Sequence, residues 1–328
     1  MKEKDVLLEI DRLSLLLHTE RGKLSAVNQV SFQIRAGETV ALVGESGCGK
    51  SITSLSIMGL IPKKTGVIEG SIRLKGKVLN QLTEKEMRSI RGRDISMIFQ
   101  EPMTSLNPVQ TIGRQIDEVF RLHTTLGKQE RRTRTIEMLR KVGIPRAETM
   151  VNDFPHQLSG GMKQRVMIAM AMACEPDLLI ADEPTTALDV TIQAQILDLM
   201  NGLKQSAQTA ILLITHDLGV VAEMADRVLV MYYGEIVEEA DVQTIFSNPK
   251  HPYTTGLLQS IPNLEVERER LEPIEGNVPI LGEIVQGCPF RLRCHLAHDV
   301  CSREKPPLVR TGKQAVRCWL YADKEVAI

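Results

Sequence analysis

The 328-residue sequence is poor in aromatic residues, with one Trp, four Tyr and six Phe, and its formal net charge is −1. A basic surface studded with aromatic rings, typical of nucleic-acid-binding proteins, is therefore not expected. No apolar run approaches the ~20 residues that a membrane-spanning helix requires, and residues 1–5 lack the apolar segment of a signal peptide. Internal repeats, low-complexity tracts and long heptad runs are also missing. We expect a cytoplasmic protein that reaches a membrane only through a partner.

The overall composition is that of an ordinary globular chain, with 43% hydrophobic and 25% charged residues. The length allows about two domains. The composition changes near residue 261, where a charge-rich segment is followed by scattered Pro and Gly. We therefore predict a main domain at 1–260 and a small, irregular C-terminal extension at 261–328.

The clearest motif is GESGCGKS at 44–51, which fits the phosphate-binding pattern G-x-x-x-x-G-K-[ST]. It follows a buried-strand pattern at 39–43 and precedes a helical pattern at 51–58. Glycines let backbone N–H groups approach phosphate oxygens, and a helix N-terminus favours an anion. Lys50 is expected to reach the β- and γ-phosphates of a nucleotide, and the Ser51 hydroxyl to bind Mg²⁺. The predicted phosphate-binding residues are Gly44, Glu45, Ser46, Gly47, Cys48, Gly49, Lys50 and Ser51.

Two further apolar strand patterns end in polar residues suited to phosphate chemistry. The first, at 178–181, is followed by Asp182, suited to hold Mg²⁺ through water, and Glu183, suited to deprotonate an attacking water. The alternative is an acidic pair that caps the next helix. The second, at 211–215, delivers His216 to a sheet edge, where it would contact a γ-phosphate. A purely structural histidine is the alternative there.

A third motif, LSGG at 158–161, precedes a helical pattern at 166–173. Ser159 suits the N-cap position, and Gly160 and Gly161 expose backbone N–H groups at the positive end of the helix. Alone, this pattern indicates only a helix cap. Its place ahead of the acidic pair favours a contact with phosphate.

With these motifs in this order, the sequence resembles the ATP-binding-cassette (ABC) ATPases. The LSGG stretch matches the family's signature, Gln100 its glutamine loop, Ala187–Leu188–Asp189 its dimer-contact loop, and His216 its switch histidine. The resemblance implies an α/β P-loop fold with an antiparallel β subdomain and a helical subdomain at about 102–160. It also implies ATP and Mg²⁺ as ligands, with Gln100 contacting Mg²⁺ and the transmembrane partner.

By the same resemblance, two ATPase subunits pair head to tail. The signature residues of one subunit would then face the ATP held by the other, and Asp189 would lie at their contact. The second ATPase subunit is expected to be a different, paired chain. The residues expected to act across this contact are Ser159, Gly160, Gly161 and Gln164.

A finer resemblance, to the ATPases of dipeptide and oligopeptide importers, rests on 99–108, on 181–190 and on 248–254. It implies an ATP hydrolase that powers peptide import at the cytoplasmic face of the bacterial inner membrane. The implied partners are two transmembrane permease subunits and an extracytoplasmic peptide-binding protein, with no nucleic acid.

Several alternatives are weighed against this interpretation. The cargo can instead be a nickel chelate, an opine or an antimicrobial peptide. Soluble ABC proteins of DNA repair or translation carry a long coiled coil or two cassettes, whereas this sequence has one phosphate loop and one signature. A non-hydrolysing regulatory subunit is disfavoured by the intact Lys50, Asp182, Glu183 and His216.

Four of the six cysteines crowd into the extension with the spacing C-x5-C-x6-C-x16-C. They are Cys288, Cys294, Cys301 and Cys318. This spacing is looser than the C-x-x-C pairs of most zinc ribbons. The residues alone leave a 4Fe–4S cluster, a zinc ion and no metal open, with His295 and His298 as spare ligands. The resemblance favours the 4Fe–4S cluster, which is associated with a similar motif in dipeptide-permease ATPases. Cys48 and Cys174 are expected to be inert.

One position departs from the family pattern. ABC ATPases usually stack an aromatic residue of the first strands on adenine, and the matching residue here is Leu17. The neighbouring His18 is the expected substitute contact.

Overall fold

The computed structural model describes residues 5–20, 22–100, 105–186, 188–260, 274–280, 283 and 286–322. The chain divides into two compact units, each built from separate segments of the sequence. Unit 1 comprises Met1–Leu7, Ile34–Glu38 and Gln81–Leu213, and unit 2 comprises Leu8–Gln33, Thr39–Asn80 and Ile214–Ile328. The units do not divide near residue 261, since the segment before that residue and the extension both belong to unit 2.

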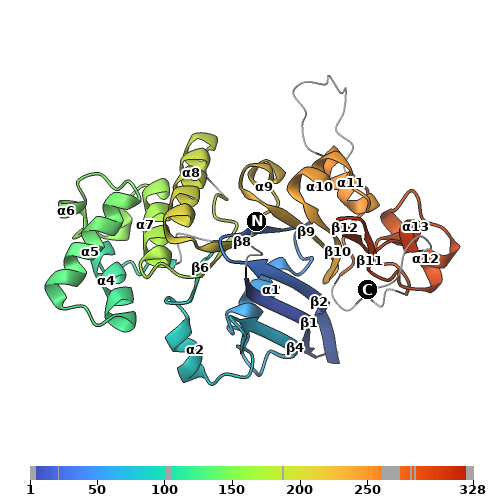
Figure 1. Cartoon of the computed structure of the whole chain (residues 1–328), viewed down its shortest axis with the longest axis horizontal. Coiled ribbons are helices and arrows are strands. Elements are labelled where there is room, and N and C mark those ends of the chain that lie inside the picture. The colour runs from blue at the N-terminus through green and yellow to red at the C-terminus, as the bar shows by residue number, and fades with distance from the viewer. Residues whose placement is uncertain are drawn as a thin grey trace. The chain divides into compact units, whose positions relative to one another are not determined.

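Two long strands dominate an antiparallel sheet that lies mainly in unit 2 (Figure 1). Its strands, in order, are β2 (Gly22–Arg35), β1 (Val6–Thr19), β4 (Gly66–Leu74) and β5 (Lys77–Val78). Buried and exposed side chains alternate along much of β2, as the two-residue period of a strand requires. The sequence pattern indicates short strands, whereas β1 and β2 each have 14 residues.

A second sheet in unit 2 carries the phosphate loop. The strands of this sheet that belong to unit 2 are, in order, β11 (Val309–Thr311), β12 (Gln314–Val316), β10 (Glu235–Asp241), β9 (Arg227–Tyr232) and β3 (Thr39–Val43). β3 runs parallel to β9, with Ala41 opposite Val228, and all five residues of β3 are buried. The helices of unit 2 are α1 (Lys50–Ile57), α9 (Leu218–Met224), α10 (Val242–Ser247), α11 (Pro252–Gln259), η2 (Arg291–Arg293), α12 (Asp299–Arg303) and α13 (Trp319–Ala322).

The small, irregular C-terminal extension also contains two short strands that the sequence pattern does not predict. β12 pairs antiparallel with β10, so the extension adds β12 and β11 to the sheet. Glu238 of β10 is fully buried and accepts hydrogen bonds from the backbone N–H groups of Lys250 and His251 at 2.7 and 2.9 Å. The Gln314 amide of β12 also donates to Glu238, at 3.4 Å. Burial raises the pKa of the Glu238 carboxyl.

The core of unit 2 joins the phosphate-loop strand to the extension. One buried cluster combines apolar residues of β3 and β9 with Tyr232, Tyr253 and Phe290. The three rings pack with centroids 4.7, 5.2 and 5.4 Å apart. Aromatic pairs at such spacing add about 0.5–1.5 kcal/mol each to the stabilisation that burial provides. Because Phe290 belongs to the extension, the extension shares this core.

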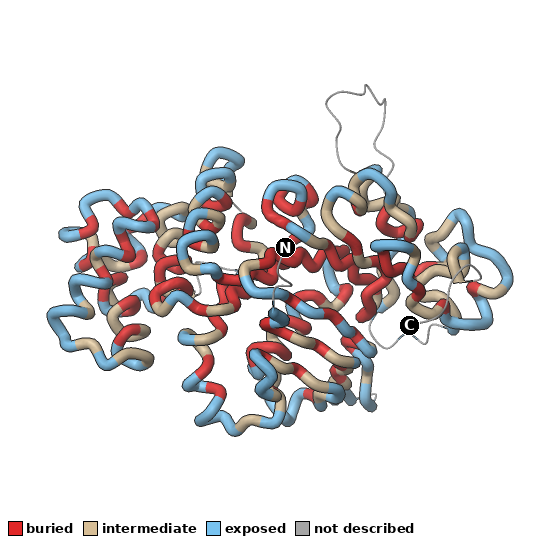
Figure 2. The backbone as a smooth tube through the Cα atoms, viewed as in Figure 1, coloured by how far each residue is buried: buried red, intermediate tan, exposed pale blue. Residues whose placement is uncertain are grey.

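Unit 1 contains β6 (Ile95–Ile98), β7 (Leu178–Asp182) and all but the last residue of β8 (Ala210–Ile214). Every residue of these strands is buried, as Figure 2 shows in red along the strands. β6 and β7 pair in parallel. Continuous apolar runs are typical of parallel strands covered on both faces, which agrees with the sequence prediction for β7 and β8.

The helical insert is present in unit 1, where α4 to α7 pack together (Figure 1). Ile112, Ile116 and Phe120 form the buried face of α4. The expected range began at 102, and residues 102–104 lie outside the described part. Among the described residues, no helix is both long and apolar enough to cross a lipid bilayer. The helices of unit 1 are α2 (Glu84–Ile90), α4 (Ile112–His123), α5 (Lys128–Lys141), α6 (Ala147–Met150), η1 (Pro155–Gln157), α7 (Gly160–Met172) and α8 (Val190–Ala207).

The β12–β10 pairing predicts that a charge on β12 strongly destabilises the protein. Val316 is fully buried opposite Glu238, so Val316→Asp would place a second carboxylate beside a buried one. We expect this variant to lose about 3–5 kcal/mol of unfolding free energy, measured by urea unfolding followed by circular dichroism. Lys313→Ala, in the exposed turn between β11 and β12, should unfold like the wild type. Equal midpoints for Val316→Asp and the wild type would contradict the pairing.

Candidate functional site

The phosphate loop, residues 44–51, connects β3 to α1 in unit 2. Gly44, Gly47 and Gly49 have φ angles of +151°, +80° and +111°, a region that side chains disfavour. A Cβ on Gly44 would lie 2.3 Å from the carbonyl oxygen of Met231 in β9. The glycine at 44 therefore lets the loop approach β9 more closely than any other residue would.

Lys50 folds back over this loop and is 6% exposed. Its Nζ donates hydrogen bonds to the carbonyl oxygens of Gly44 at 2.7 Å and Glu45 at 2.9 Å. The ammonium group is thus held among the backbone groups of the loop, at the first residue of α1. A positive charge beside a helix N-terminus is suited to bind a chain of phosphates.

Cys48 lies inside the loop and is 1% exposed. Burial raises the pKa of its thiol, while the Lys50 charge acts in the opposite direction. Burial likewise raises the pKa of Cys174. A thiol with a raised pKa is a poor nucleophile at neutral pH, in agreement with the inert role expected for both.

The acidic pair stands at the carboxyl end of β7 in unit 1. Asp182 is the last residue of the strand and is 5% exposed, and Glu183 follows with a φ of +49°. A left-handed conformation of this kind costs of order 1–3 kcal/mol and is frequent at functional sites. Glu183 Oε2 accepts hydrogen bonds from Gln100 Nε2 at 2.8 Å and from Thr186 Oγ1 at 2.9 Å. The structure therefore brings two predicted residues, Gln100 and Glu183, into direct contact.

The sequence motifs do not predict a role for Thr186 at this site. The sequence feature that could have revealed this role is the spacing: Thr186 stands three residues after Glu183, and a threonine hydroxyl at that spacing can bond back across a turn. The backbone N–H of Thr186 also donates to the Glu183 carbonyl, at 3.2 Å. Thr186 thus orients the predicted general base through both its side chain and its backbone.

Ser159 caps α7, as its sequence position predicts. Its Oγ accepts a hydrogen bond from the Met162 N–H at 3.3 Å. A Cβ on Gly160 would meet nothing within 4 Å, whereas one on Gly161 would lie 2.9 Å from Ile192 Cγ2 on α8. Gly160 therefore leaves the N-terminus of α7 accessible, and Gly161 permits close packing of α7 on α8.

Gln164, which is expected to act across a subunit contact, is buried in its own chain. Its side chain is 1% exposed, and Nε2 donates to the carbonyl oxygen of Pro184 at 2.5 Å. Gln164 thus joins α7 to the acidic turn of its own chain. Its buried Oε1 has no hydrogen-bond partner within the described structure, so only the amide nitrogen is satisfied.

The other residues predicted to contact ATP or a second subunit, Asp189, His216 and His18, are exposed. Asp189 caps α8, accepting a hydrogen bond from the Ile192 N–H at 2.9 Å. His216 follows β8, and His18 lies in β1. Ala187, in the expected dimer-contact loop, lies outside the described residues.

The four late cysteines gather in the extension of unit 2. Cys301 is buried and the other three are half-buried, and the Cys288 N–H donates to the Cys301 carbonyl at 2.8 Å. Each thiol lies within electrostatic reach of the other three. Burial raises the pKa of Cys288 and of Cys318 to about 11. Among the described side chains, no three of the types His, Cys, Asp and Glu are arranged around a single metal ion.

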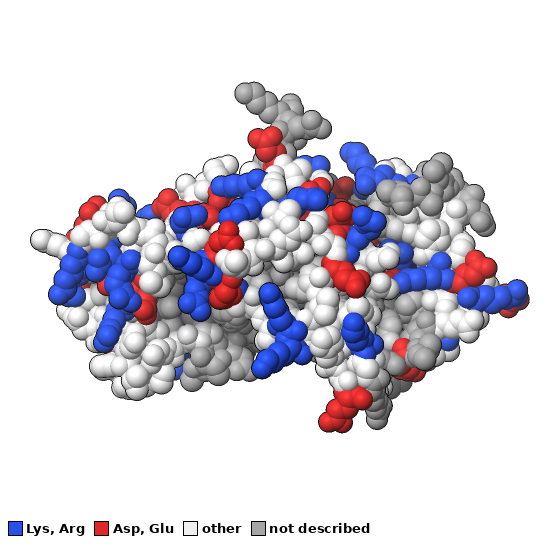
Figure 3. Space-filling view, turned by 90° about the horizontal axis from the view of Figure 1, so that it is seen from below, with Lys and Arg blue, Asp and Glu red and all other residues white. Residues whose placement is uncertain are grey.

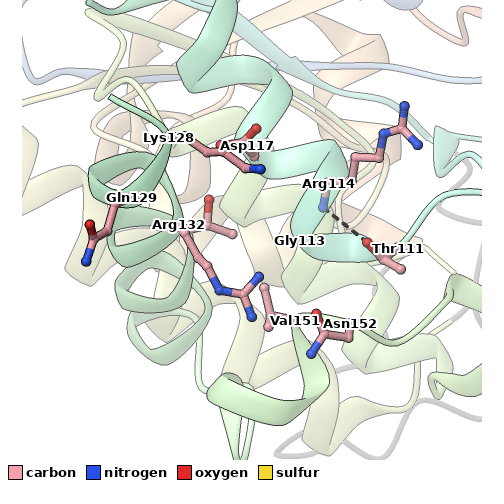
Figure 4. A pocket seen from close by; sticks show the side chains of 10 residues that line it. Thr111, Gly113, Arg114, Asp117, Lys128, Gln129, Arg132, Val151 and Asn152 are labelled. Atoms are coloured by element: carbon pink, nitrogen blue, oxygen red, sulfur yellow. Dashed lines mark hydrogen bonds between the residues drawn. The ribbon is translucent and has the colours of Figure 1, made fainter. Parts of the chain in front are cut away.

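A separate cavity of about 500 Å³ lies in the helical insert (Figure 4). It is lined by α4, by α5 and by Val151 and Asn152. Thr135 of α5 is 1% exposed, and its hydroxyl has no hydrogen-bond partner within the described structure. None of the predicted nucleotide-binding residues lines this cavity.

Comparison with known proteins relates these features to two family models. Residues 27–186 match the model described as ABC transporter, and residues 237–301 match "Oligopeptide/dipeptide transporter, C-terminal region". The chain is 54% identical over 321 residues to the oligopeptide transport ATP-binding protein AppD of Bacillus subtilis (strain 168), covering 97% of this chain and 98% of AppD. It is 51% identical over 319 residues to the dipeptide transport ATP-binding protein DppD of the same strain, covering 97% and 95%.

Solved structures show the same core. The dimeric post-hydrolysis state of the ATP-binding cassette MJ0796, bound to ADP and Pi, matches with a TM-score of 0.64 and 28% identity. The match covers 72% of this chain and 99% of MJ0796. The cbiO1 protein of Clostridium perfringens matches with a TM-score of 0.63 and 26% identity, covering 75% of this chain and 92% of cbiO1.

Proposed function

Because this chain belongs to the ABC transporter family of ATP-binding proteins, we propose that it hydrolyses ATP to power the import of di- or oligopeptides. The observation that carries the proposal is the presence, in one chain, of the ABC core and the oligopeptide/dipeptide C-terminal region. The names of AppD and DppD, which align with nearly the whole chain, point to the same class of cargo.

ATP would bind through the phosphate loop. Lys50 would exchange its two carbonyl partners for the β- and γ-phosphates, and the backbone N–H groups of 44–51 would surround the phosphate oxygens. The Ser51 hydroxyl, the Asp182 carboxylate and the Gln100 amide are hard oxygen ligands of the kind that Mg²⁺ prefers. When bound, Mg²⁺ would neutralise charge on the β- and γ-phosphates.

Glu183 would act as the general base for the attacking water. The hydrogen bonds from Gln100 and Thr186 fix the orientation of its carboxylate before substrate arrives. His216 would contact the γ-phosphate, and His18 would lie against adenine. These roles are assigned because each residue occupies the matching position in the family's order of motifs.

A second ATPase subunit, expected to be a different chain, would complete the site. Ser159 and Gly160 are exposed at the N-terminus of α7, so they are available to phosphates held by a partner. Gly161 would act with them, and Asp189 would lie at the contact. Gln164, also expected from the resemblance to act across this contact, would do so from a side chain whose amide donates to the Pro184 carbonyl of its own chain.

Two transmembrane permease subunits and an extracytoplasmic peptide-binding protein would form the rest of the importer. The chain would then lie at the cytoplasmic face of the bacterial inner membrane. The exposed apolar side chains of Phe99, at 42%, and Val109, at 79%, flank the glutamine-loop region and are suited to contact a permease.

A role with nucleic acid has less support. Positive and negative side chains of the described residues are interspersed over the face shown in Figure 3. A nucleic-acid-binding face more often gathers Lys and Arg in one patch or stripe.

The four cysteines would hold a 4Fe–4S cluster, for which four thiolates are a complete ligand set. A zinc ion, the alternative, would be bound by the same four sulfurs at about 2.3 Å. The thiols of Cys288 and Cys318, whose pKa values burial raises to about 11, would release protons on binding. The bound group would supply a redox-active or structural centre.

Replacing Glu183 tests the hydrolytic role. Glu183→Gln keeps the shape of the side chain and removes the base, so ATP hydrolysis by the assembled transporter should fall at least about 100-fold. Equilibrium binding of ATP should remain within about threefold of the wild type. Glu223→Gln, an exposed change on α9, should hydrolyse ATP normally. Near-normal turnover by Glu183→Gln would exclude Glu183 as the general base.

Capture from the native membrane tests the partners. The wild-type chain should retain two permease subunits and a peptide-binding protein, identified by mass spectrometry. Val109→Asp should reduce permease recovery by about tenfold or more, because it places a charge in an apolar contact, and should leave ATP binding intact. Leu122→Asp, equally apolar and 66% exposed near the end of α4, is the control. Full permease recovery with Val109→Asp would show that the surface around Val109 does not contact the permease.

Anaerobic purification tests the cysteine site. The protein should be brown and contain about four iron atoms per chain. Cys301→Ser should lose the iron and the colour, whereas Cys174→Ser should keep both, because Cys174 lies outside the late cluster. Colourless protein with stoichiometric zinc would contradict the 4Fe–4S cluster and show that the cysteines bind zinc.

A further inference from the structure

The phosphate loop is tied to the C-terminal extension by an ion pair within unit 2. Arg293 Nη1 donates to Glu45 Oε2 at 2.6 Å, and Nη2 donates to Glu45 Oε1 at 2.9 Å. This two-pronged pair joins residues 248 positions apart in the sequence. The Arg293 side chain is only 5% exposed, and that of Glu45 is 31% exposed. Such a partly buried, bidentate pair is far more restrictive than a surface salt bridge.

The guanidinium of Arg293 is fixed by its whole surroundings. All three of its nitrogens donate, because Nε also bonds the Glu275 carbonyl at 2.9 Å and Nη2 the Ile274 carbonyl at 3.3 Å. The group lies 5.9 Å from the ring centres of Tyr232 and Phe290, a favourable position for a cation. Arg293 therefore holds its position through contacts that do not involve the loop.

Glu45 is held at its backbone as well. Its N–H donates to the hydroxyl of Tyr253 at 2.8 Å, and Tyr253 is fully buried against Tyr232 and Phe290. Its carbonyl oxygen accepts from Lys50. Glu45 thus contacts Lys50 of the phosphate loop as well as Tyr253 and Arg293, which come after the core strands in the sequence.

A carboxylate inside a phosphate loop opposes the binding of a triphosphate, because like charges repel. We propose that Arg293 is a positioning residue of the ATP site, which neutralises Glu45 and holds its carboxylate in one place. With Glu45 paired, Lys50 and the N-terminus of α1 present a net positive field to the phosphates. The inference rests on the proposed role of the phosphate loop, and it makes the extension part of the nucleotide site.

The test is the affinity of the purified full-length chain for Mg–ATP, measured by calorimetry for a set of variants. Arg293→Met should bind ATP at least about tenfold more weakly, because the unpaired carboxylate remains in the loop. Glu45→Gln alone should bind ATP at least as tightly as the wild type, because the loop loses a negative charge, and the double variant Glu45→Gln/Arg293→Met should recover most of the affinity that Arg293→Met loses. The loss in Arg293→Met should also shrink at high salt, since exposed charges are screened.

Arg291→Met is the matched control. Arg291 lies in the same short helix, η2, and its Nη1 donates to the Cys288 carbonyl at 3.4 Å. Its removal disturbs the same cysteine-bearing segment without touching the loop, so ATP affinity should not change. If Arg293→Met fails to fold, as judged by thermal unfolding, Arg293→Lys replaces it. A single ammonium cannot hold both oxygens, so about two- to fivefold weaker binding is expected, again restored by Glu45→Gln.

Two outcomes would overturn the inference. One is wild-type affinity in folded Arg293→Met, and the other is failure of Glu45→Gln to restore affinity, which would leave Arg293 a purely structural role. Lys50→Ala separates this inference from the proposed function. Normal ATP binding by Lys50→Ala would remove the phosphate-loop assignment itself, whereas loss of binding there with normal Arg293→Met would remove only the role of Arg293.

Discussion

The parallel pairing of β3 with β9 is the interaction on which the rest of unit 2 depends. β3 leads directly into the phosphate loop, and β9 supplies the carbonyl against which Gly44 rests. β9 in turn pairs with β10, and β10 with β12 of the extension. The conformation of an eight-residue loop near the start of the chain is therefore determined by strands and side chains from its last third.

The acidic turn of unit 1 shows how a strained residue is kept in place. Glu183 adopts a left-handed conformation, and three hydrogen bonds surround it, from Gln100, from Thr186 and from Gln164 to the next residue's carbonyl. Hydrogen bonds of this kind contribute about 0.5–1.5 kcal/mol each, enough together to offset a strain of about 1–3 kcal/mol. Gln100 thus binds the Glu183 carboxylate, and Gln164 of α7 holds the backbone of the same turn.

Much of this arrangement could be predicted from the sequence, because its signals are local. The glycines of 44–51, the apolar runs of β7 and β8 and the Ser159 cap each depend on neighbouring residues. The three-residue strands β11 and β12 carry no periodic pattern, and they form because the edge of β10 offers hydrogen-bond partners. The partners of Arg293 and Gln164 were equally hidden, since they depend on contacts between distant segments.

The distance between Glu45 and Arg293 has a consequence for synthesis on the ribosome. Arg293 follows Glu45 by 248 positions, so at about 5–20 residues per second it emerges roughly 12–50 s later. Asp226, whose carboxylate accepts a hydrogen bond from the Thr39 N–H at the start of β3, likewise emerges 187 residues after Thr39. Throughout that interval the nascent β3 lacks β9 as a neighbour and offers an open strand edge. The β9 edge of β3, and with it the phosphate loop, therefore completes its contacts late in translation, although β1, β2, β4 and β5 can already pair with one another.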